Sequence, residues 1–363
     1  MIANVDKQGS LTALREAVCE AAAKRAPVRI RAGGTKDFYG NITTGAILDP
    51  RRYTGVIAYE PSELVITACA GTPLTELENL LAEHGQMLAF EPPHFGSDAT
   101  LGGCIGAGLA GPRRTAYGPC YGGVRDFVLG ARMLDGRGEI LTFGGSVMKN
   151  VAGYDLARLL VGSLGILGVI LEASVKVLPQ PATQLTLSFE LDEQEALDRL
   201  NAWAGQPLPL SASAWHEGVL NVRLSGNRAA VADARGRLGG ELMEASRADA
   251  FWIQIREQTH PFFAGAQPLW RVSVPSTLPP LALHGEQMIE WGGALRWLRS
   301  SQPANEVRAA AQRGGGHATL FRSEAASDVF TPLPAPLMAV HKRLKAHFDP
   351  AGIFNPGRLY REL

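Results

Sequence analysis

The sequence predicts an α+β protein made of two domains and a closing C-terminal segment. Three observations support this: the first half mixes short apolar strands with helices, the second half mixes helices with hairpins, and Pro179-Gln-Pro181 separates the two halves. A chain of 363 residues is long enough for two sizeable cores. We therefore expect one domain over residues 1–180, a second over residues 181–330 and a closing segment over residues 331–363.

In the first half, apolar side chains recur at helical spacing over residues 11–24, which predicts an amphipathic helix. A second helix is expected to be capped by Thr72, with Pro73 at its first position and Gly85 just past its end. Further elements are a helix at residues 148–161 and strands at residues 28–31, 45–49, 56–59, 64–68, 124–133, 139–143 and 169–178.

The second half predicts an α+β domain with an antiparallel sheet. Residues 185–191 alternate apolar and polar side chains, which is typical of a strand with one buried face. Hairpins are expected to turn at Glu217-Gly218 and at Gly292-Gly293. A strand is expected at residues 269–274, and helices at residues 192–203, 227–238, 251–258 and 337–348.

Composition excludes several classes of function. Lys plus Arg number 35 and Asp plus Glu number 35, so no net positive charge favours a nucleic acid. The four cysteines, Cys19, Cys69, Cys104 and Cys120, are too scattered to hold an iron–sulfur cluster, and they fit a reducing compartment. No signal peptide or membrane-spanning run is expected. The prediction is a cytoplasmic protein, with peripheral association at the inner membrane through partners left open.

The most informative stretch runs from Glu91 to Arg114 and carries six glycines between Gly96 and Gly111. Clustered glycines are typical where backbone amides closely approach a phosphate. Residues 106–111 match the dinucleotide fingerprint G-x-G-x-x-G. That match is weak support for NAD, because the fingerprint needs a preceding strand and a following helix, and neither is expected here.

Two more glycine-rich segments lie outside this stretch, at residues 32–36 and 162–170. The first of them follows the short apolar run 28–30, as a phosphate loop after a strand does. Three such loops could close around one extended ligand that contains a pyrophosphate.

In their order, these segments resemble the vanillyl-alcohol-oxidase type, or PCMH type, of FAD-binding domain. The resemblance covers nearly the whole chain and is greatest with the family of FAD-binding subunits of bacterial glycolate oxidases. The matching segments are residues 31–36, 98–103, 124–130, 148–156, 162–170, 291–297, 315–319 and 348–358.

This resemblance implies a PCMH-type FAD-binding domain of two α/β subdomains, followed by an α+β cap domain with an antiparallel sheet. It implies noncovalent FAD, because covalent relatives place a histidine directly after the paired glycines, where this chain has Thr35. Amides of Gly33, Gly34, Gly102 and Gly103 are expected to face the pyrophosphate. The expected cofactor-binding residues are Arg31, Ala32, Gly33, Gly34, Thr35, Lys36, Pro92, Asp98, Ala99, Thr100, Gly102, Gly103, Cys104, Ala107, Tyr117, Gly118, Gly162, Gly165, Gly168, Val169, Ile170 and Asn355.

The same resemblance implies a flavin-dependent subunit of a 2-hydroxy-acid dehydrogenase that converts glycolate to glyoxylate. Its implied partners are a sister flavoprotein that carries the substrate site and an iron–sulfur subunit that accepts electrons. Catalytic relatives use a His-Gly-Asp-Gly-Asn-x-His motif with a metal, and the nearest sequence here is Arg313-Gly-Gly-Gly-His317. We therefore expect no catalytic residue, no metal and no activity of the isolated chain. A self-sufficient flavin oxidase and a non-catalytic scaffold stay open as alternatives.

Several side chains near the glycine loops have more than one possible role. Arg113 and Arg114 could offset phosphate charge, bind a partner subunit or form a solvated pair. His94 is more typical of a hydrogen-bonded structural histidine than of a base. Tyr154 and Asp155 could orient the flavin's surroundings or pack and cap a helix.

Overall fold

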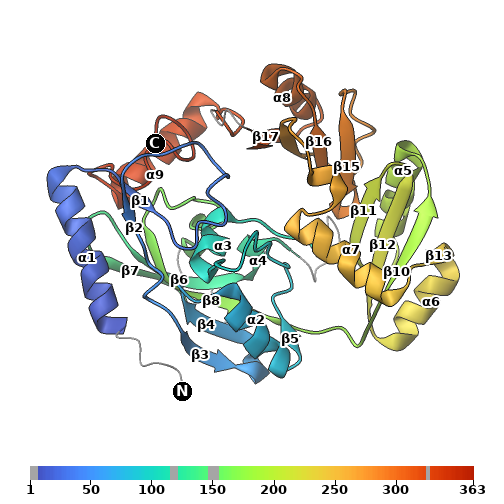
Figure 1. The fold of residues 1–363 in the computed structure, drawn as a ribbon, viewed down its shortest axis with the longest axis horizontal. Helices are drawn as coiled ribbons and strands as arrows, with labels where there is room; N and C mark the ends of the chain where they lie inside the picture. The colour runs from blue at the N-terminus through green and yellow to red at the C-terminus, as the bar shows by residue number, and fades with distance from the viewer. Residues whose placement is uncertain (1–6, 115–121, 146–154, 324–327) are drawn as a thin grey trace.

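The computed structural model describes residues 7–114, 122–145, 155–323 and 328–363. Two units lie side by side, each built around its own sheet (Figure 1). The first contains a five-stranded sheet and both chain ends, and the second contains an eight-stranded sheet. This mixture of helices and antiparallel sheets confirms the predicted α+β class.

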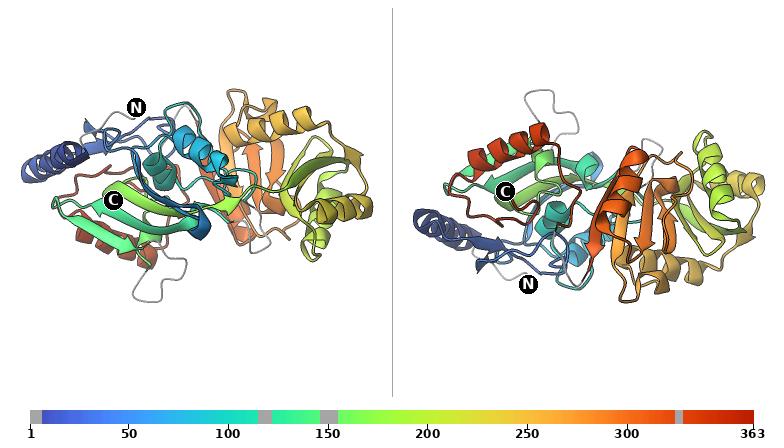
Figure 2. Two further views of the ribbon diagram at one scale, coloured as in Figure 1. Left: turned by 90° about the horizontal axis from the view of Figure 1, so that it is seen from below. Right: turned by 90° about the horizontal axis from the view of Figure 1, so that it is seen from above.

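The five-stranded sheet is antiparallel throughout. Its order is β3 (Val56–Glu60), β4 (Val65–Cys69), β8 (Val169–Lys176), β6 (Val128–Leu134) and β7 (Ile140–Gly144). Helices α2 (Leu74–Glu83) and α3 (Leu101–Ala107) lie on one face, and α9 (Ala335–Phe348) lies on the other (Figure 2). The main core of this unit fills the space between these layers.

A small parallel pair of strands, β1 (Val28–Ile30) and β2 (Ala46–Leu48), sits at the edge of the first unit. Helix α1 (Lys7–Lys24) packs against this pair and shares a second core with it. Phe354 forms a parallel bridge with Val28, so the C-terminal segment runs beside β1. The C-terminal segment therefore lies next to the strand from which the following loop starts.

The eight-stranded sheet of the second unit, which we call the cap sheet, is also antiparallel throughout. Its order is β13 (Glu241–Leu242), β10 (Thr183–Glu190), β12 (Val219–Gly226), β11 (Leu210–His216), β15 (Glu286–Glu290), β16 (Leu295–Arg299), β14 (Leu269–Ser273) and β17 (His317–Arg322). The strand pairs β11–β12 and β15–β16 confirm both predicted hairpins.

The two faces of the cap sheet have different neighbours because side chains alternate along each strand. One face packs against α5 (Glu193–Ala204), α6 (Arg228–Leu238) and α8 (Ala304–Arg313). The other packs against α7 (Ala245–Glu257) and against side chains of the first unit. This second face therefore forms the junction between the two units.

Some predicted boundaries are wrong. Thr72 does not cap α2: the capping position is Pro73, and Thr72 Oγ1 instead accepts a hydrogen bond from the Gly55 amide at 2.9 Å. The strand predicted at residues 124–133 begins with the short helix α4 (Val124–Phe127), which continues directly into β6.

Other elements were not predicted at all, among them α3, α8 and β17. Half of the helix predicted at residues 148–161 falls outside the described residues, and its described part contains the 3₁₀ helix Ala157–Leu159. The predicted boundary at residues 179–181 lies just before β10, and the division into domains stays a prediction. Among the described residues, none of the helices has both the length and the apolar composition to cross a lipid bilayer.

Candidate functional site

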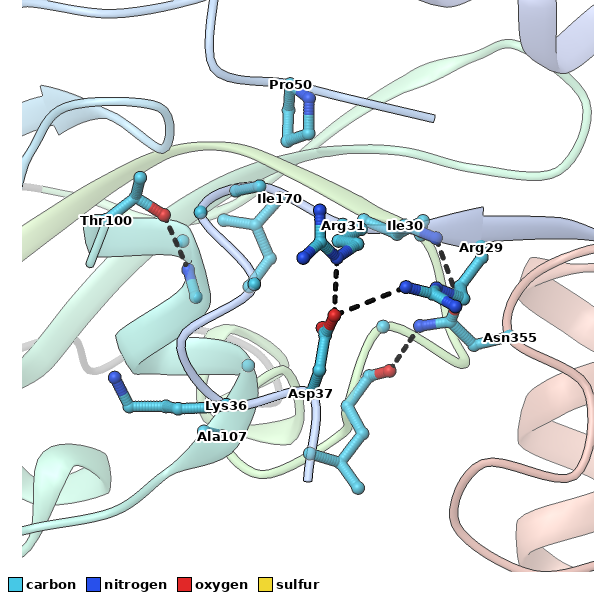
Figure 3. Close-up of a pocket in the computed structure, with 18 of the residues that line it drawn as sticks. Arg29, Ile30, Arg31, Lys36, Asp37, Pro50, Thr100, Ala107, Ile170 and Asn355 are labelled. Carbon is cyan, nitrogen blue, oxygen red and sulfur yellow. Dashed lines mark hydrogen bonds and ion pairs between the residues drawn. The ribbon is translucent and has the colours of Figure 1, made fainter. Parts of the chain in front are cut away.

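A cavity of about 900 Å³, partly open to solvent, lies where the loop after β1 meets α3 and the C-terminal segment (Figure 3). Of the 22 expected cofactor-binding residues, 16 line it. They are Arg31, Ala32, Gly33, Gly34, Thr35, Lys36, Asp98, Thr100, Gly102, Gly103, Ala107, Gly165, Gly168, Val169, Ile170 and Asn355. The three glycine-rich loops therefore meet at one space, which we call the loop cavity.

Four of the expected residues do not line the loop cavity: Pro92, Ala99, Cys104 and Gly162. Ala99 and Cys104 are buried in the main core behind it, and the Gly162 amide donates to Ile105 O at 3.0 Å. Tyr117 and Gly118 lie outside the described residues.

Nine lining residues were missed by the sequence analysis. Arg358 lies inside the recognised C-terminal segment, and Arg29 precedes the first glycine loop, so proximity to a motif was the available signal. The missed residues are Arg29, Ile30, Asp37, Thr43, Pro50, Ala70, Gly106, Leu164 and Arg358.

The loop after β1 has the backbone of an anion-binding loop. The amides of residues 32–36 donate no hydrogen bond to any residue that the structure describes. These five residues all line the loop cavity. A row of unsatisfied amides costs free energy unless water or a ligand accepts from it, and successive amides of this kind suit the oxygens of a phosphate.

The loop containing Gly33 and the segment containing Asp98 touch each other. A Cβ atom on Gly33 would lie 1.7 Å from the Asp98 carbonyl oxygen, so only glycine permits this approach. We expected the amides of Gly102 and Gly103 to face the pyrophosphate, and this expectation is wrong. Their amides already donate to Ala70 O at 2.8 Å and to the Thr100 hydroxyl at 3.2 Å, so these glycines supply space rather than free donors.

The C-terminal segment closes one wall of the loop cavity. Asn355 accepts a hydrogen bond from the Ile30 amide at 2.8 Å and donates to Leu164 O at 2.6 Å, and Figure 3 shows it beside β1. Arg358 donates to the carbonyl oxygens of Asp37 and Tyr39 at 3.0 and 2.7 Å. The Asn355 and Arg358 side chains therefore connect the C-terminal segment to β1, to the loop that follows it and to Leu164, around the loop cavity.

Charge at the loop cavity is positive on balance. Among the described residues, Arg29, Arg31, Lys36 and Arg358 line it together with two carboxylates, those of Asp37 and Asp98. Both Arg29 and Arg31 pair with Asp37, as Figure 3 shows. Burial lowers the pKa of Lys36, whose Nζ donates to His94 O at 3.2 Å. Free amides and excess cations together fit a diphosphate.

Arg113, Arg114 and His94 do not line the loop cavity. The interpretation of Arg113 and Arg114 as a solvated pair is wrong. Arg113 is 4% exposed and pairs with Glu91, and the Arg114 guanidinium lies 4.2 Å from the centre of the Trp291 ring. His94 Nε2 lies 3.1 Å from a Glu78 carboxylate oxygen, which supports a structural role. Tyr154 lies outside the described residues.

Glu91 forms an ionic clamp between the two units. Its carboxylate accepts from the Arg113 amide at 2.9 Å, from Arg113 Nε at 3.2 Å and from Arg223 Nη2 of β12 at 2.8 Å. Burial alone would raise the pKa of Glu91, but the charges and hydrogen bonds of Arg223 and Arg113 hold it at about 2. The clamp is therefore ionised at neutral pH and contributes stability through its pairing.

One group of metal-ligating side chains occurs among the described residues, formed by His216, Glu217 and Glu286. It is exposed in part, lies on the cap sheet and includes no residue of the loop cavity. His216 Nε2 lies 2.9 Å from a Glu286 oxygen, and this ion pair accounts for the arrangement without a metal. The absence of a catalytic metal stays a prediction.

Comparison with known proteins identifies the family. A model described as "FAD binding domain" matches residues 4–144, and one described as "FAD linked oxidases, C-terminal domain" matches residues 333–359. The chain is 50% identical over 351 residues to glycolate oxidase subunit GlcE of Escherichia coli (strain K12), covering 97% of both chains. The chain belongs to the FAD-linked oxidase family. The expected cofactor, FAD, and the expected flavin-dependent oxidoreductase class are thereby confirmed.

Two further relatives of this FAD-linked oxidase chain are informative. Glycolate oxidase subunit GlcD of Bacillus subtilis (strain 168) is 35% identical over 166 residues, which cover 45% of this chain and 34% of that protein. A solved structure of alkyldihydroxyacetonephosphate synthase superposes with a TM-score of 0.63 at 15% identity, covering 94% of this chain and 74% of that one. The latter likeness concerns the fold alone and confirms the expected PCMH-type architecture.

A leucine at Gly106 should abolish FAD binding without unfolding the protein. Gly106 lines the loop cavity within α3, and a Cβ atom there would meet no other atom within 4 Å, so the side chain would fill cofactor space. Gly236 of α6 has equally open surroundings and is the matched control. Both changes should stabilise their helix by up to about 1 kcal/mol. FAD absorbance per protein should be lost only in G106L, and its retention there would contradict this assignment.

Proposed function

We propose that this chain is the FAD-binding subunit of a glycolate oxidase and that it holds FAD noncovalently in the loop cavity. The row of free amides at residues 32–36 carries the assignment of the cofactor site. The identity of 50% over nearly the full length with a glycolate oxidase subunit supports the choice of substrate for the assembly.

The cavity-lining residues have distinct roles in this proposal. Amides of Gly33, Gly34 and Thr35 receive the pyrophosphate oxygens, and Arg31 and Lys36 offset their charge. The sides of the space are formed by Val169 and Ile170 at the start of β8 and by Ala107 at the end of α3. Bound FAD would supply the capacity to accept two electrons from a 2-hydroxy acid and to release them singly.

The attachment of FAD is proposed to be noncovalent. Thr35 lines the loop cavity where covalent relatives place a histidine, and the described lining contains no cysteine, histidine or tyrosine that could bond to the flavin. Acid or heat should therefore release a yellow molecule with the mass of FAD from the purified protein. Flavin that remains on the denatured chain would contradict noncovalent attachment, and a colourless protein that cannot be reconstituted would contradict the FAD site.

The partners in this proposal are a sister flavoprotein with the substrate site and an iron–sulfur subunit that accepts electrons. The support is chemical: none of the eight histidines lines the loop cavity, and both of its carboxylates are bonded to neighbouring side chains. Scattered cysteines leave this chain without a cluster of its own. In this proposal, any association of the complex with a membrane is made by these partner subunits.

A further inference from the structure

Helix α9 carries a buried lysine that bonds to the backbone of two segments of the loop cavity. The side chain of Lys345 is 9% exposed, and its Nζ atom donates to Ile166 O at 2.8 Å and to Phe354 O at 2.7 Å. Its third hydrogen bond goes to a carboxylate oxygen of Asp349 at 2.6 Å. All three donors of the ammonium group are therefore used. Lys345 does not itself line the loop cavity, so contact with FAD does not account for it.

Both carbonyl oxygens belong to walls of the loop cavity. Ile166 lies in the glycine-rich segment 162–170, and five residues of that segment line the cavity. Phe354 directly precedes Asn355, which lines the cavity from the C-terminal segment. Asn355 also donates to Leu164 O at 2.6 Å. The segment 162–170 and the C-terminal segment are thus joined twice, by Asn355 at the cavity and by Lys345 outside its lining.

Asp349 holds both the lysine and the turn that leads to Asn355. Its buried carboxylate accepts from the Ile353 amide at 3.0 Å and from the Phe354 amide at 2.8 Å, in addition to Lys345. Burial is the main cause that lowers the pKa of Lys345, and the hydrogen bond and charge of Asp349 act in the opposite direction. A buried ammonium group without this counter-ion would be costly, so the two side chains depend on each other.

The contact between the two walls leaves little room for adjustment. A Cβ atom on Gly165 would lie 2.7 Å from Asn355 Nδ2, and Gly165 has a φ of +73°, which favours glycine. Asn355 also accepts from the Ile30 amide at 2.8 Å, just before the row of free amides at residues 32–36. Because closely packed segments shift together, the position of Asn355 affects both the loop 32–36 and the segment 162–170.

We propose that Lys345 is a positioning residue for FAD: it fixes the spacing between the segment 162–170 and Asn355, and it thereby sets the width of the loop cavity. This inference rests on the proposed FAD site and extends it to a residue that does not touch the ligand. A cavity whose walls are already in place binds its ligand more tightly, because no free energy is spent on ordering them. A lysine that only stabilised the fold would affect unfolding and leave FAD affinity unchanged.

Equilibrium dialysis of FAD against the FAD-free full chain tests this role. In K345M/D349N both charges are removed together, so no lone charge is left buried. The dissociation constant of FAD should rise at least about tenfold in this variant, because two hydrogen bonds between the walls are lost. D349N is the matched control within the pair. Its Lys345 amino group still donates to both carbonyl oxygens, so the dissociation constant should stay within about threefold of wild type.

E91Q is the control for general destabilisation. Glu91 forms other buried ion pairs and does not line the loop cavity. E91Q should therefore lower the melting temperature, while the dissociation constant of FAD stays within about threefold of wild type. Should K345M/D349N fail to fold, K345Q/D349N takes its place. Its amide can donate to one of the two carbonyl oxygens, and a loss of affinity of at least about threefold is expected.

Hydrogen exchange of the FAD-free chain gives a second, independent readout. The Asn355 amide donates to Val28 O at 3.0 Å, and the Leu164 amide donates to Gly106 O at 2.9 Å. Both amides should exchange faster in K345M/D349N than in D349N, because the walls that contain them lose their common anchor. Amides of the cap sheet should exchange equally in the two variants.

Equal FAD affinity in K345M/D349N and D349N, or equal exchange of these two amides, would overturn the inference. A loss of affinity in E91Q as large as that in K345M/D349N would show that Lys345 acts only through overall stability, which also contradicts it. The proposed function fails separately: a wild-type chain that binds no FAD would contradict the site. The exchange comparison would then still show whether Lys345 joins the two walls.

Discussion

Purified alone, this chain should oxidise glycolate at least a hundredfold more slowly per FAD than the assembled complex. Among the described residues, the lining of the loop cavity has no histidine, Asp37 pairs with Arg29 and Arg31, and Asp98 is exposed and accepts a hydrogen bond from the Ser97 hydroxyl at 3.5 Å. Loss of a general base costs about a hundred- to ten-thousand-fold in rate.

The measurement is dye reduction by glycolate with the isolated chain and with the chain co-expressed with its sister flavoprotein and iron–sulfur subunit. Activity should appear only in the second case and should vanish when this chain is omitted. G236L, which leaves the loop cavity untouched, should support full activity of the assembly, whereas G106L should not. Rapid turnover of glycolate or D-lactate by the isolated chain would favour a self-sufficient oxidase.

Glu91→Ala should lower the free energy of unfolding by about 3–5 kcal/mol, because it removes the carboxylate with which two buried arginines pair. Arg113 and Arg223 are 4% and 3% exposed, so water cannot replace the carboxylate at low cost. The matched control is Glu20→Ala on α1, which removes an exposed pair with Lys24 and should leave the free energy of unfolding nearly unchanged. Urea denaturation monitored by tryptophan fluorescence measures both values.

The same clamp gives the protein a defined acid sensitivity. The pKa of Glu91 is about 2 in the folded chain, below its ordinary value of 4.5. The unfolded state therefore binds more protons, and the stability from the pair is complete above pH 4.5 and is lost as the pH falls toward 2. The contribution is about 3 kcal/mol. Glu91→Ala should flatten the stability curve in this range, and an unchanged curve would exclude the clamp as its cause.

Local patterns predicted the loop cavity well because glycine leaves a strong signal where backbones approach closely. The loops at residues 32–36, 98–103 and 165–170 were recognised separately, and the structure brings all three to one space. Asn355 was expected there from the C-terminal segment, and it reaches Ile30 across the fold. The positions of glycines in the sequence predict such close contacts, because the contacts depend on backbone geometry that few other residues tolerate.

The same glycines concealed helix α3. Three of its seven residues are glycine, each of which costs a helix about 1 kcal/mol relative to alanine. Burial of Leu101, Cys104 and Ile105 in the main core compensates for this cost. Such tertiary packing cannot be predicted from a short stretch of sequence.

Ion pairs between residues that are distant in the sequence could not be predicted from local sequence patterns either. Glu91 and Arg223 are 132 residues apart, and nothing in either neighbourhood indicates the other. Arg271 and Glu290 were not singled out from the sequence, and only the register of the cap sheet brings them to one pocket. Sites that depend on long-range pairing therefore need the folded structure.

The contact between the two ends of the chain has a consequence for biosynthesis. Val28 is bridged by Phe354, and the loop after β1 is held by Asn355 and Arg358, which a ribosome adds more than 300 residues later. The wall of the loop cavity thus stays incomplete during translation, even after the five-stranded sheet has been made. Loading with FAD must therefore follow the synthesis of this segment, so a nascent chain that stalls before Asn355 would remain an apoprotein.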